Sequence, residues 1–264
     1  MSINKNNCNN KYRINETVLT FEDGIKEITE SLLHNMEYCS NNENFIKKDV
    51  RDITKVIIPE GVTHIHKFSF YNMSKLETVI LPDSLTHIGI GAFEGCINIK
   101  NIFIPDKVRT IHRRAFLGCV TLQSINLPKC LSEIENNVFS ECSSLQNIVI
   151  PTGITNIGKE SFYRCSSLLD INLPDTISYI GDYAFAFCES LRRITIPKEI
   201  RNLNECLFSH CTNLESITLS KSIRYIDNST FDNTPNVLIR CSENNEYVKE
   251  FAIKRDFKYE PLKI

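Results

Sequence analysis

The sequence predicts a solenoid, a single elongated stack of short coils. A phenylalanine, a proline and a cysteine each recur every 23 residues along the 264-residue chain. A fixed repeat of about 20 to 50 residues is the signature of stacked units, none of which can bury its apolar face alone. The phenylalanines are Phe70, Phe93, Phe116, Phe139, Phe162, Phe185, Phe208 and Phe231. The prolines are Pro59, Pro82, Pro105, Pro128, Pro151, Pro174 and Pro197, and Ser220 takes the next position.

Each repeat opens with a strand-like segment. One unit, read from Leu76, runs LxxVxLPxxLxxIxxxAFxxC, so that Val79 and Leu81 lie two residues apart, as in a strand, before Pro82. Aliphatic residues in alternation favour a short strand with one buried face. Proline lacks the N–H that a ladder needs and therefore ends each strand at the same height. The pattern predicts one short strand per coil, and the stacked strands should form a parallel ladder.

The remainder of each coil returns the chain to the next strand. A second apolar pair follows at a spacing of three, as in Leu85 and Ile88. This spacing suits either a turn of 3₁₀ helix or a half-extended segment. A small residue, the phenylalanine and then the cysteine follow, and they indicate a short helical turn. Since 23 residues leave no room for a full outer α-helix, we expect a slender stack with moderate curvature.

The phenylalanine column should run through the shared core. Burying one such ring contributes about 1.5–3 kcal/mol by transfer from water. We therefore interpret the eight phenylalanines as structural core residues rather than as part of a cofactor site.

Cysteine follows the same period. Six of the 11 cysteines share one column: Cys96, Cys119, Cys142, Cys165, Cys188 and Cys211. Free cysteine packs as a small buried hydrophobe, which favours a column of inward thiols. A disulfide ladder is the alternative, although parallel stacked side chains rarely present the required geometry. The spacing contains no CxxC pair and no zinc-finger quartet. The off-column cysteines share no obvious role: Cys8, Cys39, Cys130, Cys206 and Cys241.

The N-terminal end departs from the regular array. Within a ninth, degenerate coil, Leu33 and Met36 take the places of Phe70 and Met73. A polar insertion around Ser40–Asp52 should form a loop. The predicted boundaries are 1–14 for a disordered tail, 15–52 for the degenerate coil with its insertion loop, 53–240 for the regular repeats and 241–264 for a C-terminal cap.

The C-terminal cap is predicted to contain a helix over Ser242–Arg255 with Ser242 as its N-cap. Phe257–Leu262 could add a last strand. An amphipathic helix here would cover the open face of the final coil. Its acidic and basic residues are balanced, which favours capping over the alternative of membrane-surface binding. Its apolar face comprises Tyr247, Val248, Phe251 and Ala252.

Composition limits the classes of partner and the cellular location that we expect for this chain. The formal net charge of −2 provides no overall basic field, so nucleic acid is not an expected partner. No run of 18 apolar residues occurs, so no membrane insertion is expected. The polar N-terminus has no apolar stretch of signal-peptide length. On these grounds the chain is predicted to be cytoplasmic.

The pattern IxxIxxxAFxxCxxLxxIxIP, repeated about eight times, resembles the BspA-like class of leucine-rich repeats. The resemblance covers residues 15–240, and Cys241–Pro261 resembles the C-terminal cap of that class. It implies a leucine-rich-repeat solenoid that binds rather than catalyses. Such proteins occur on the surfaces of bacteria and protist parasites, where they are implicated in adhesion to host or matrix proteins. The alternative is therefore a surface-displayed adhesin or antigen that reaches the cell surface by a non-classical route.

A candidate binding site follows from the strand pattern. Residues flanking each central aliphatic point outward and form columns about 4.8 Å apart between coils. One column reads Ile57, Ile80, Phe103, Asn126, Val149, Asn172, Thr195 and Thr218. Exposed apolar side chains of this kind often mark protein contacts, so Ile57, Ile80, Phe103 and Val149 are the predicted partner-binding residues. The alternatives are that the insertion loop or the N-terminal coil covers them, or that they merely suit a strand.

No catalytic constellation stands out. His64 and His87 share one column, and His66 and His112 share another; we interpret them as solvated histidines rather than metal ligands. No Ser/His/Asp arrangement and no glycine-rich phosphate loop is distinguished from background. The sequence thus predicts a non-catalytic protein–protein interaction module without metal or cofactor, which binds a protein ligand along its outward strand face. Neither the identity of that ligand nor an oligomeric state follows from the sequence.

Overall fold

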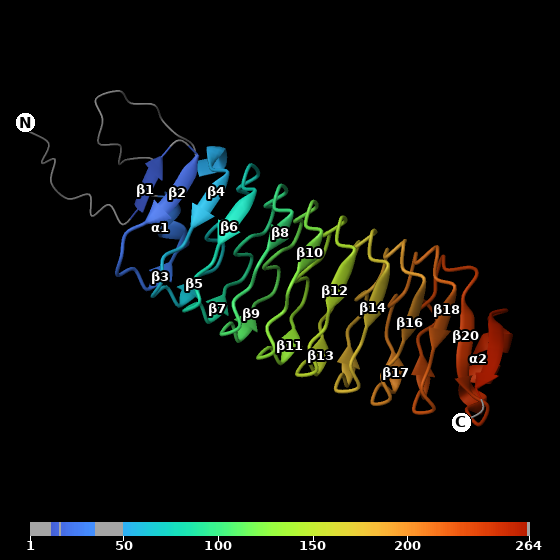
Figure 1. Cartoon of the computed structure of the whole chain (residues 1–264). Helices are drawn as coiled ribbons and strands as arrows, with labels where there is room; N and C mark the ends of the chain where they lie inside the picture. Colours follow the sequence, from blue (N-terminus) through green and yellow to red (C-terminus); the bar gives the residue numbers. More distant parts are fainter. Residues whose placement is uncertain (1–11, 16, 35–49, 263–264) are drawn as a thin grey trace, which may run out of the picture.

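A computed structural model of the chain describes residues 12–15, 17–34 and 50–262 (Figure 1). It shows an elongated stack of coils that follow one another in chain order, with β1 and α1 at one end and α2 at the other. The parallel ladder predicted from the alternating residues is confirmed. Val56 pairs with Val79, and Ile148 pairs with Ile171, each 23 residues apart.

The first strand of each regular coil ends two or three residues before the proline, or Ser220, that recurs every 23 residues. These strands are β4 (Lys55–Ile57), β6 (Thr78–Ile80), β8 (Asn101–Ile102), β10 (Ser124–Ile125), β12 (Asn147–Val149), β14 (Asp170–Asn172), β16 (Arg193–Thr195) and β18 (Ser216–Thr218). They form two sheets, ordered β1-β2-β4-β6 and β21-β20-β18-β16-β14-β12-β10-β8.

Each regular coil contains a second strand, where the sequence predicted only one. The second apolar pair takes the half-extended option, because its isoleucine pairs with the equivalent residue of the next coil, as Ile65 does with Ile88. These strands are β5 (His64–Ile65), β7 (His87–Ile88), β9 (Thr110–Ile111), β11 (Glu133–Ile134), β13 (Asn156–Ile157), β15 (Tyr179–Ile180), β17 (Asn202–Leu203) and β19 (Tyr225–Ile226). They form three sheets, ordered β3-β5-β7-β9, β11-β13-β15 and β17-β19.

The return segment that carries the phenylalanine is not the predicted helical turn. Its N–H groups alternate between two kinds of acceptor. The Phe93 N–H donates to Ala115 O of the next coil at 2.8 Å, whereas the Cys96 N–H donates to Phe93 O at 3.2 Å. Two residues per coil, four apart, adopt left-handed φ angles, as at Gly91 (56°) and Gly95 (73°). These residues break the helix and turn alternate N–H groups toward the neighbouring coil.

Most coils carry side chains at these left-handed positions, although the conformation costs a residue other than glycine about 1–2 kcal/mol. The contacts that the turn makes with the next coil must offset this cost. The residues in the two columns are Phe68, Asn72, Arg114, Asn137, Glu141, Glu160, Arg164, Tyr183, Phe187, Cys206, His210 and Asn233.

The phenylalanine spine is confirmed. Successive rings from Phe70 to Phe231 stack with centroid separations between 5.1 and 5.9 Å. All eight are buried. The spine ends against the cap, where the Phe257 ring meets the Phe231 ring edge-on at 5.4 Å.

The cysteine column is a ladder of free, buried thiols, as the favoured interpretation predicted. Each thiol also makes a hydrogen bond that the sequence gave no reason to expect. Cys142 Sγ donates to the carbonyl oxygen of Phe116 in the preceding coil at 3.2 Å, and the other five repeat this contact. In the last coil the Thr234 hydroxyl takes the same place and donates to Phe208 O at 2.7 Å. Cys8 and Cys39 lie outside the described residues.

At the N-terminal end, β1 (Tyr12–Asn15) pairs antiparallel with β2 (Val18–Phe21). The predicted disordered tail, residues 1–14, therefore wrongly includes the first residues of β1, from Tyr12 on. The degenerate coil is present, because Leu19 pairs with Val56 in the same register as the regular repeats. Leu33 is buried, as its match to Phe70 implied. The other elements here are β3 (Glu27–Ile28), α1 (Glu30–His34) and η2 (Val50–Asp52). Met36 and residues 40–49 of the insertion lie outside the described residues.

The C-terminal cap consists of β20 (Leu238–Ser242), α2 (Glu246–Lys254) and β21 (Lys258–Leu262). The helix begins later than predicted, and its N-cap is Asn245 rather than Ser242; the Asn245 side chain accepts from the Val248 N–H at 3.1 Å. Ser242 instead extends the ladder, where it pairs with Leu262. Because β20 is paired on both sides, its residues up to Ser242 stay extended, and the helix begins after them. The predicted last strand is present as β21.

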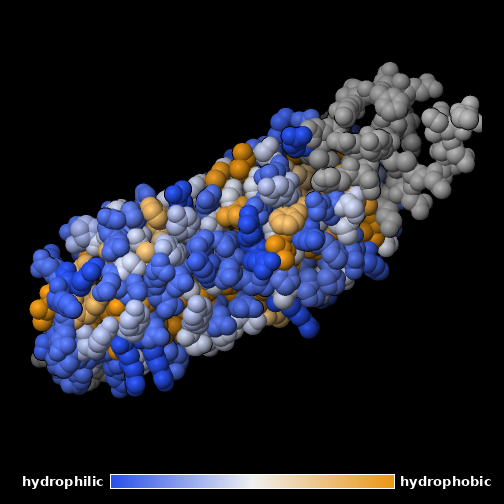
Figure 2. Space-filling view, turned by 180° about the vertical axis from the view of Figure 1, so that it is seen from behind, coloured by the Kyte–Doolittle hydropathy of each residue, from blue (hydrophilic) through white to orange (hydrophobic). Residues whose placement is uncertain are grey.

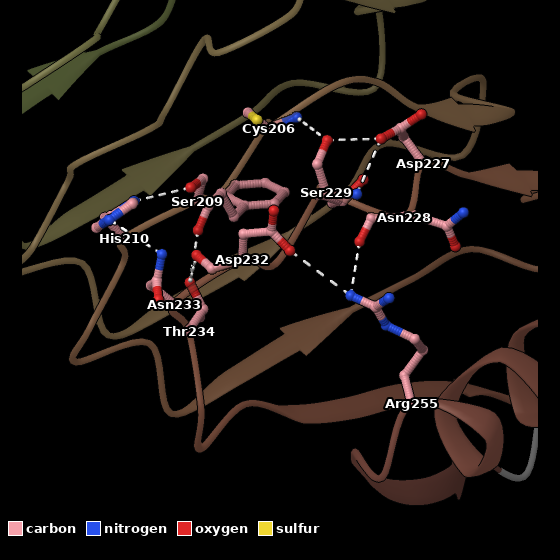
Figure 3. Close-up of polar contacts among 12 residues, drawn as sticks. Cys206, Ser209, His210, Asp227, Asn228, Ser229, Asp232, Asn233, Thr234 and Arg255 are labelled. Carbon is pink, nitrogen blue, oxygen red and sulfur yellow. Dashed lines mark hydrogen bonds and ion pairs between the residues drawn. The ribbon is translucent and has the colours of Figure 1, made fainter.

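Two side chains of the cap complete hydrogen bonds that a further coil would otherwise make. The Tyr247 hydroxyl accepts from the Ile226 N–H at 2.9 Å at the open edge of β19. Arg255 donates to Asn228 O at 2.7 Å and pairs with Asp232 at 3.6 Å (Figure 3). The cap thus satisfies backbone groups of the last coil as well as covering its core.

We expect Phe139→Ala, in the middle of the spine, to lower the free energy of unfolding by about 3–5 kcal/mol, since the lost ring leaves a cavity between two coils. Urea denaturation followed by circular dichroism would measure this. Val149→Ala, at a fully outward position, is the control and should change stability by no more than about 0.5 kcal/mol. Equal effects of the two substitutions would contradict the buried spine.

Native-state alkylation should distinguish the ladder thiols from the exposed one. Burial raises the pKa of the Cys119 and Cys211 thiols to about 12, so almost no thiolate exists at pH 8. We expect iodoacetamide to modify the exposed Cys130 promptly and the ladder cysteines only after urea is added. Peptide mass spectrometry would read the modified positions. Labelling of native Cys119 as fast as Cys130 would show that the ladder is open to solvent.

Candidate binding face

The strand face is the set of outward side chains in or directly after the first strands of the regular coils. These strands are β4, β6, β8, β10, β12, β14, β16 and β18. Each strand buries its central aliphatic residue and turns its flanking residues to solvent, as alternation requires. The four predicted partner-binding residues all lie on this face. Ile80 is 45 % exposed, Phe103 67 % and Val149 81 %, whereas Ile57 is half-buried. Among the residues that the structure describes, none covers Phe103 or Val149. Their role in binding stays a prediction.

Asn126 interrupts the apolar column, which the sequence pattern did not explain. Its Oδ1 accepts from the Ile104 N–H at 2.8 Å, and its Nδ2 donates to Ile104 O at 2.7 Å. In some other coils the backbone of the next strand makes such a bond, as when the Ile58 N–H donates to Ile80 O. The structure thus brings Ile80 and Phe103 together and separates Val149 from them by one half-buried amide.

The centre of the strand face carries no charge. We call the eight outward positions in or directly after β6, β8, β10 and β12 the neutral strip: Thr78, Ile80, Asn101, Phe103, Ser124, Asn126, Asn147 and Val149. Charged side chains border it, for example Glu77 and Lys100 before the strands and Asp106 after them. A charge-depleted centre within a charged rim is the usual composition of a protein interface.

The opposite side of the stack has a different character. Figure 2, the view from behind, shows a surface that is mostly hydrophilic, with apolar residues in small separate groups. Scattered apolar residues of this kind are normal on soluble proteins and indicate no particular contact.

His64 and His87 lie on the second strands β5 and β7 of two adjacent coils. The His64 and His87 rings stack at 4.3 Å with an interplanar angle of 6°. The Thr86 hydroxyl donates to Thr63 O at 2.9 Å and therefore accepts from His87 Nδ1, 2.7 Å away. This arrangement fixes the ring of His87 as the Nδ1–H tautomer.

The other two histidines in these columns contact carboxylates. His66 lies 2.9 Å from Glu27, and His112 lies 2.8 Å from Glu135. The structure brings together no group of three or more potential metal ligands within its described residues. These histidines are thus tied into local polar contacts rather than gathered around one point.

The described part of the chain has no helix that is both long and apolar enough to cross a membrane.

A stack of equal coils with parallel strand ladders, a continuous apolar spine and a covering helix defines a leucine-rich repeat solenoid. The family described as BspA type leucine rich repeat region matches residues 41–169 and 132–260, with six copies. The chain therefore belongs to the BspA-type leucine-rich repeat family. This fold is typically a non-enzymatic scaffold, and its repeats generally serve protein interaction. A search of curated proteins gives no significant match.

Among solved structures, a leucine-rich repeat protein from Bacteroides ovatus is similar over 87 % of this chain and 69 % of its own, with 24 % identity and a TM-score of 0.61. This likeness supports the fold. The leucine-rich repeat protein of T. pallidum shares 24 % identity over 94 % of each chain, with a TM-score of 0.46. A leucine rich cell surface protein from Faecalibacterium prausnitzii shares 20 % identity over 90 % of this chain and 88 % of its own, with a TM-score of 0.34.

We expect the His87 stack to make stability depend on pH. Burial, then His64, His112 and Arg109, lower the pKa of His87 in the folded chain. As pH falls through the ordinary histidine pKa, about 6.5, the unfolded chain binds the proton first, so acidification costs folding free energy. Urea midpoints of the wild type should therefore fall more between pH 7.5 and pH 5 than those of His87→Thr, which copies Thr110 of the next coil. Parallel pH profiles of the two proteins would contradict this.

Proposed function

We propose that this chain is a non-catalytic binding module whose protein partner lies along the strand face, with the neutral strip at the centre of the contact. The observation that carries the proposal is the exposure of Phe103 and Val149 within eight outward positions that bear no charge. Transferring such side chains from water to a partner surface is favourable by about 1.5–3 kcal/mol for a ring or branched side chain.

The ladder makes this surface rigid before any partner arrives. The strands that carry Ile80 and Val149 are paired in register with neighbouring strands, so their backbone does not need to be ordered on binding. Preorganisation of this kind reduces the entropic cost of association. Aromatic side chains near the centre of an interface commonly dominate the binding energy, and Phe103 is the exposed aromatic residue of the neutral strip.

Photocrosslinking would identify the partner. A benzoylphenylalanine introduced at position 103 in the producing cells should crosslink one protein in preference to others, and the same protein should be recovered from position 149. Position 195, in the same column on β16, is the matched negative position. Recovery of different proteins from 103 and 149 would argue against a common contact.

With the partner purified, we expect Phe103→Asp to weaken binding at least tenfold, because it buries a charge where a ring had been. Thr195→Asp adds the same charge at the equivalent place on another strand and should change the Kd less than twofold. Titration calorimetry would measure both. Since the side chain of Phe103 is exposed, both variants should unfold at the wild-type urea concentration. Unchanged binding by a folded Phe103→Asp would overturn the proposal.

A further inference from the structure

The ladder of second strands is interrupted between β15 and β17, which belong to different sheets. Apart from this point and a similar break between β9 and β11, the N–H that follows each second strand donates to the preceding coil, as the Gly181 N–H does to Ile157 O at 2.8 Å. At the interruption a side chain replaces this bond: Asn204 Nδ2 donates to Ile180 O at 2.6 Å. The two coils remain stacked, but their outward surface opens at this point.

A shallow depression of about 390 Å³ lies over the interruption. Polar side chains dominate its lining: Ser178, Glu199, Arg201, Asn202 and Asn204. Tyr179 forms one wall and also borders a second depression of about 340 Å³, which Glu133, Glu135 and Asn156 line on the other side. Gly158 lets two coils approach closely there, because a Cβ at this position would come within 2.6 Å of the Asn136 backbone nitrogen. An exposed aromatic ring thus lies between two hollows lined with polar groups.

A second tyrosine lies further along the same outward column. Tyr179 and Tyr225 are each 49 % exposed and lie two coils apart, with Asn202 between them. At about 4.8 Å per coil, their backbones are roughly 10 Å apart. The Tyr225 hydroxyl donates to Asp227 at 2.9 Å. Ser229 also donates to Asp227, at 2.6 Å (Figure 3). These contacts hold the Tyr225 ring in place.

Two arginines follow this column on one side. Arg201 and Arg224 immediately precede Asn202 and Tyr225, and their coils are adjacent, since the Arg224 N–H donates to Arg201 O at 2.8 Å. Both are exposed, and neither side chain forms an ion pair within the described part of the chain. Other arginines of these coils do, for example Arg193 with Asp170. Since neither guanidinium group is paired with a carboxylate, each can bind an anion, which Arg holds through two parallel hydrogen bonds.

We propose that the surface over β15, β17 and β19 binds an acidic oligosaccharide. A sugar ring has an apolar C–H face that can lie on Tyr179 or Tyr225 and a rim of hydroxyl groups that can bond to the Asn202 amide and to Glu199. Carboxylates along such a chain would pair with Arg201 and Arg224. The polar lining does not suit an apolar small molecule, which needs a mostly hydrophobic pocket. Glu199, Asp227 and Glu205 nearby would repel the dense charge of a nucleic acid.

This site lies on the second strands rather than on the strand face, so its success or failure leaves the protein-binding proposal unaffected. Titration calorimetry of the full chain with a hyaluronan hexasaccharide would test it, with neutral chitohexaose and a thymidine hexanucleotide for comparison. We expect the hyaluronan hexasaccharide to bind at least tenfold more tightly than either. Comparable binding of chitohexaose would overturn the role of the arginines, and comparable binding of the hexanucleotide would overturn the assignment to a glycan.

Variants locate the contact. Tyr179→Ala and Arg201→Gln should each weaken the binding of the hyaluronan hexasaccharide at least tenfold. Tyr71→Ala, which removes a tyrosine of similar exposure (48 %) outside the second strands, is the matched control and should bind as the wild type does. Arg201→Gln changes an exposed side chain and should fold as the wild type does. It therefore still tests the site if Tyr179→Ala is less stable than the wild type. No detectable binding by the wild type, or binding as tight as that of the wild type by both Tyr179→Ala and Arg201→Gln, would overturn the proposal.

Discussion

The stacking of each 23-residue coil on the next is the interaction on which the rest of the structure depends. In most coils a Phe ring, a cysteine thiol and alternate backbone N–H groups find their partners in the neighbouring coil, with ring separations of 5.1 to 5.9 Å. Because each bond joins residues at fixed sequence separations, a change of coil length would disturb all of them at once.

The same constraint explains the two ends. A coil without a neighbour would expose one face of the spine and a row of unpaired backbone groups, which solenoids cover with a distinct capping element. At the N-terminus, β1 pairs antiparallel with β2 and thereby departs from the repeat. At the C-terminus, Phe257 closes the spine, and Tyr247 satisfies a backbone N–H of the last ladder. The caps therefore copy the contacts of a coil without copying its sequence.

Periodicity revealed what recurs in every coil and missed what differs between coils. The Phe and Cys columns, the parallel ladder and the exposure of Phe103 all follow from residue spacing. The second strand was missed because two residues are too few to show alternation. The left-handed turns were missed because residues such as Glu141 and Phe187 are not the glycines that usually mark them. The hydrogen bonds of the Asn126 side chain to Ile104 and the interruption beside Tyr179 could not be predicted from the repeat. Each depends on one side chain that does not recur in other coils.

The dependence of each coil on its neighbours has a mechanical consequence. If the chain were pulled by its two ends, force would act on one junction at a time, and the molecule would lengthen in steps as coils peeled away. Each step would release 23 residues, or roughly 80 Å of extended chain at about 3.3–3.6 Å per residue. Arg255, which ties the cap to Asn228 and Asp232, stands at the junction that bears load first from the C-terminal side. Such a molecule yields gradually under tension rather than by a single rupture.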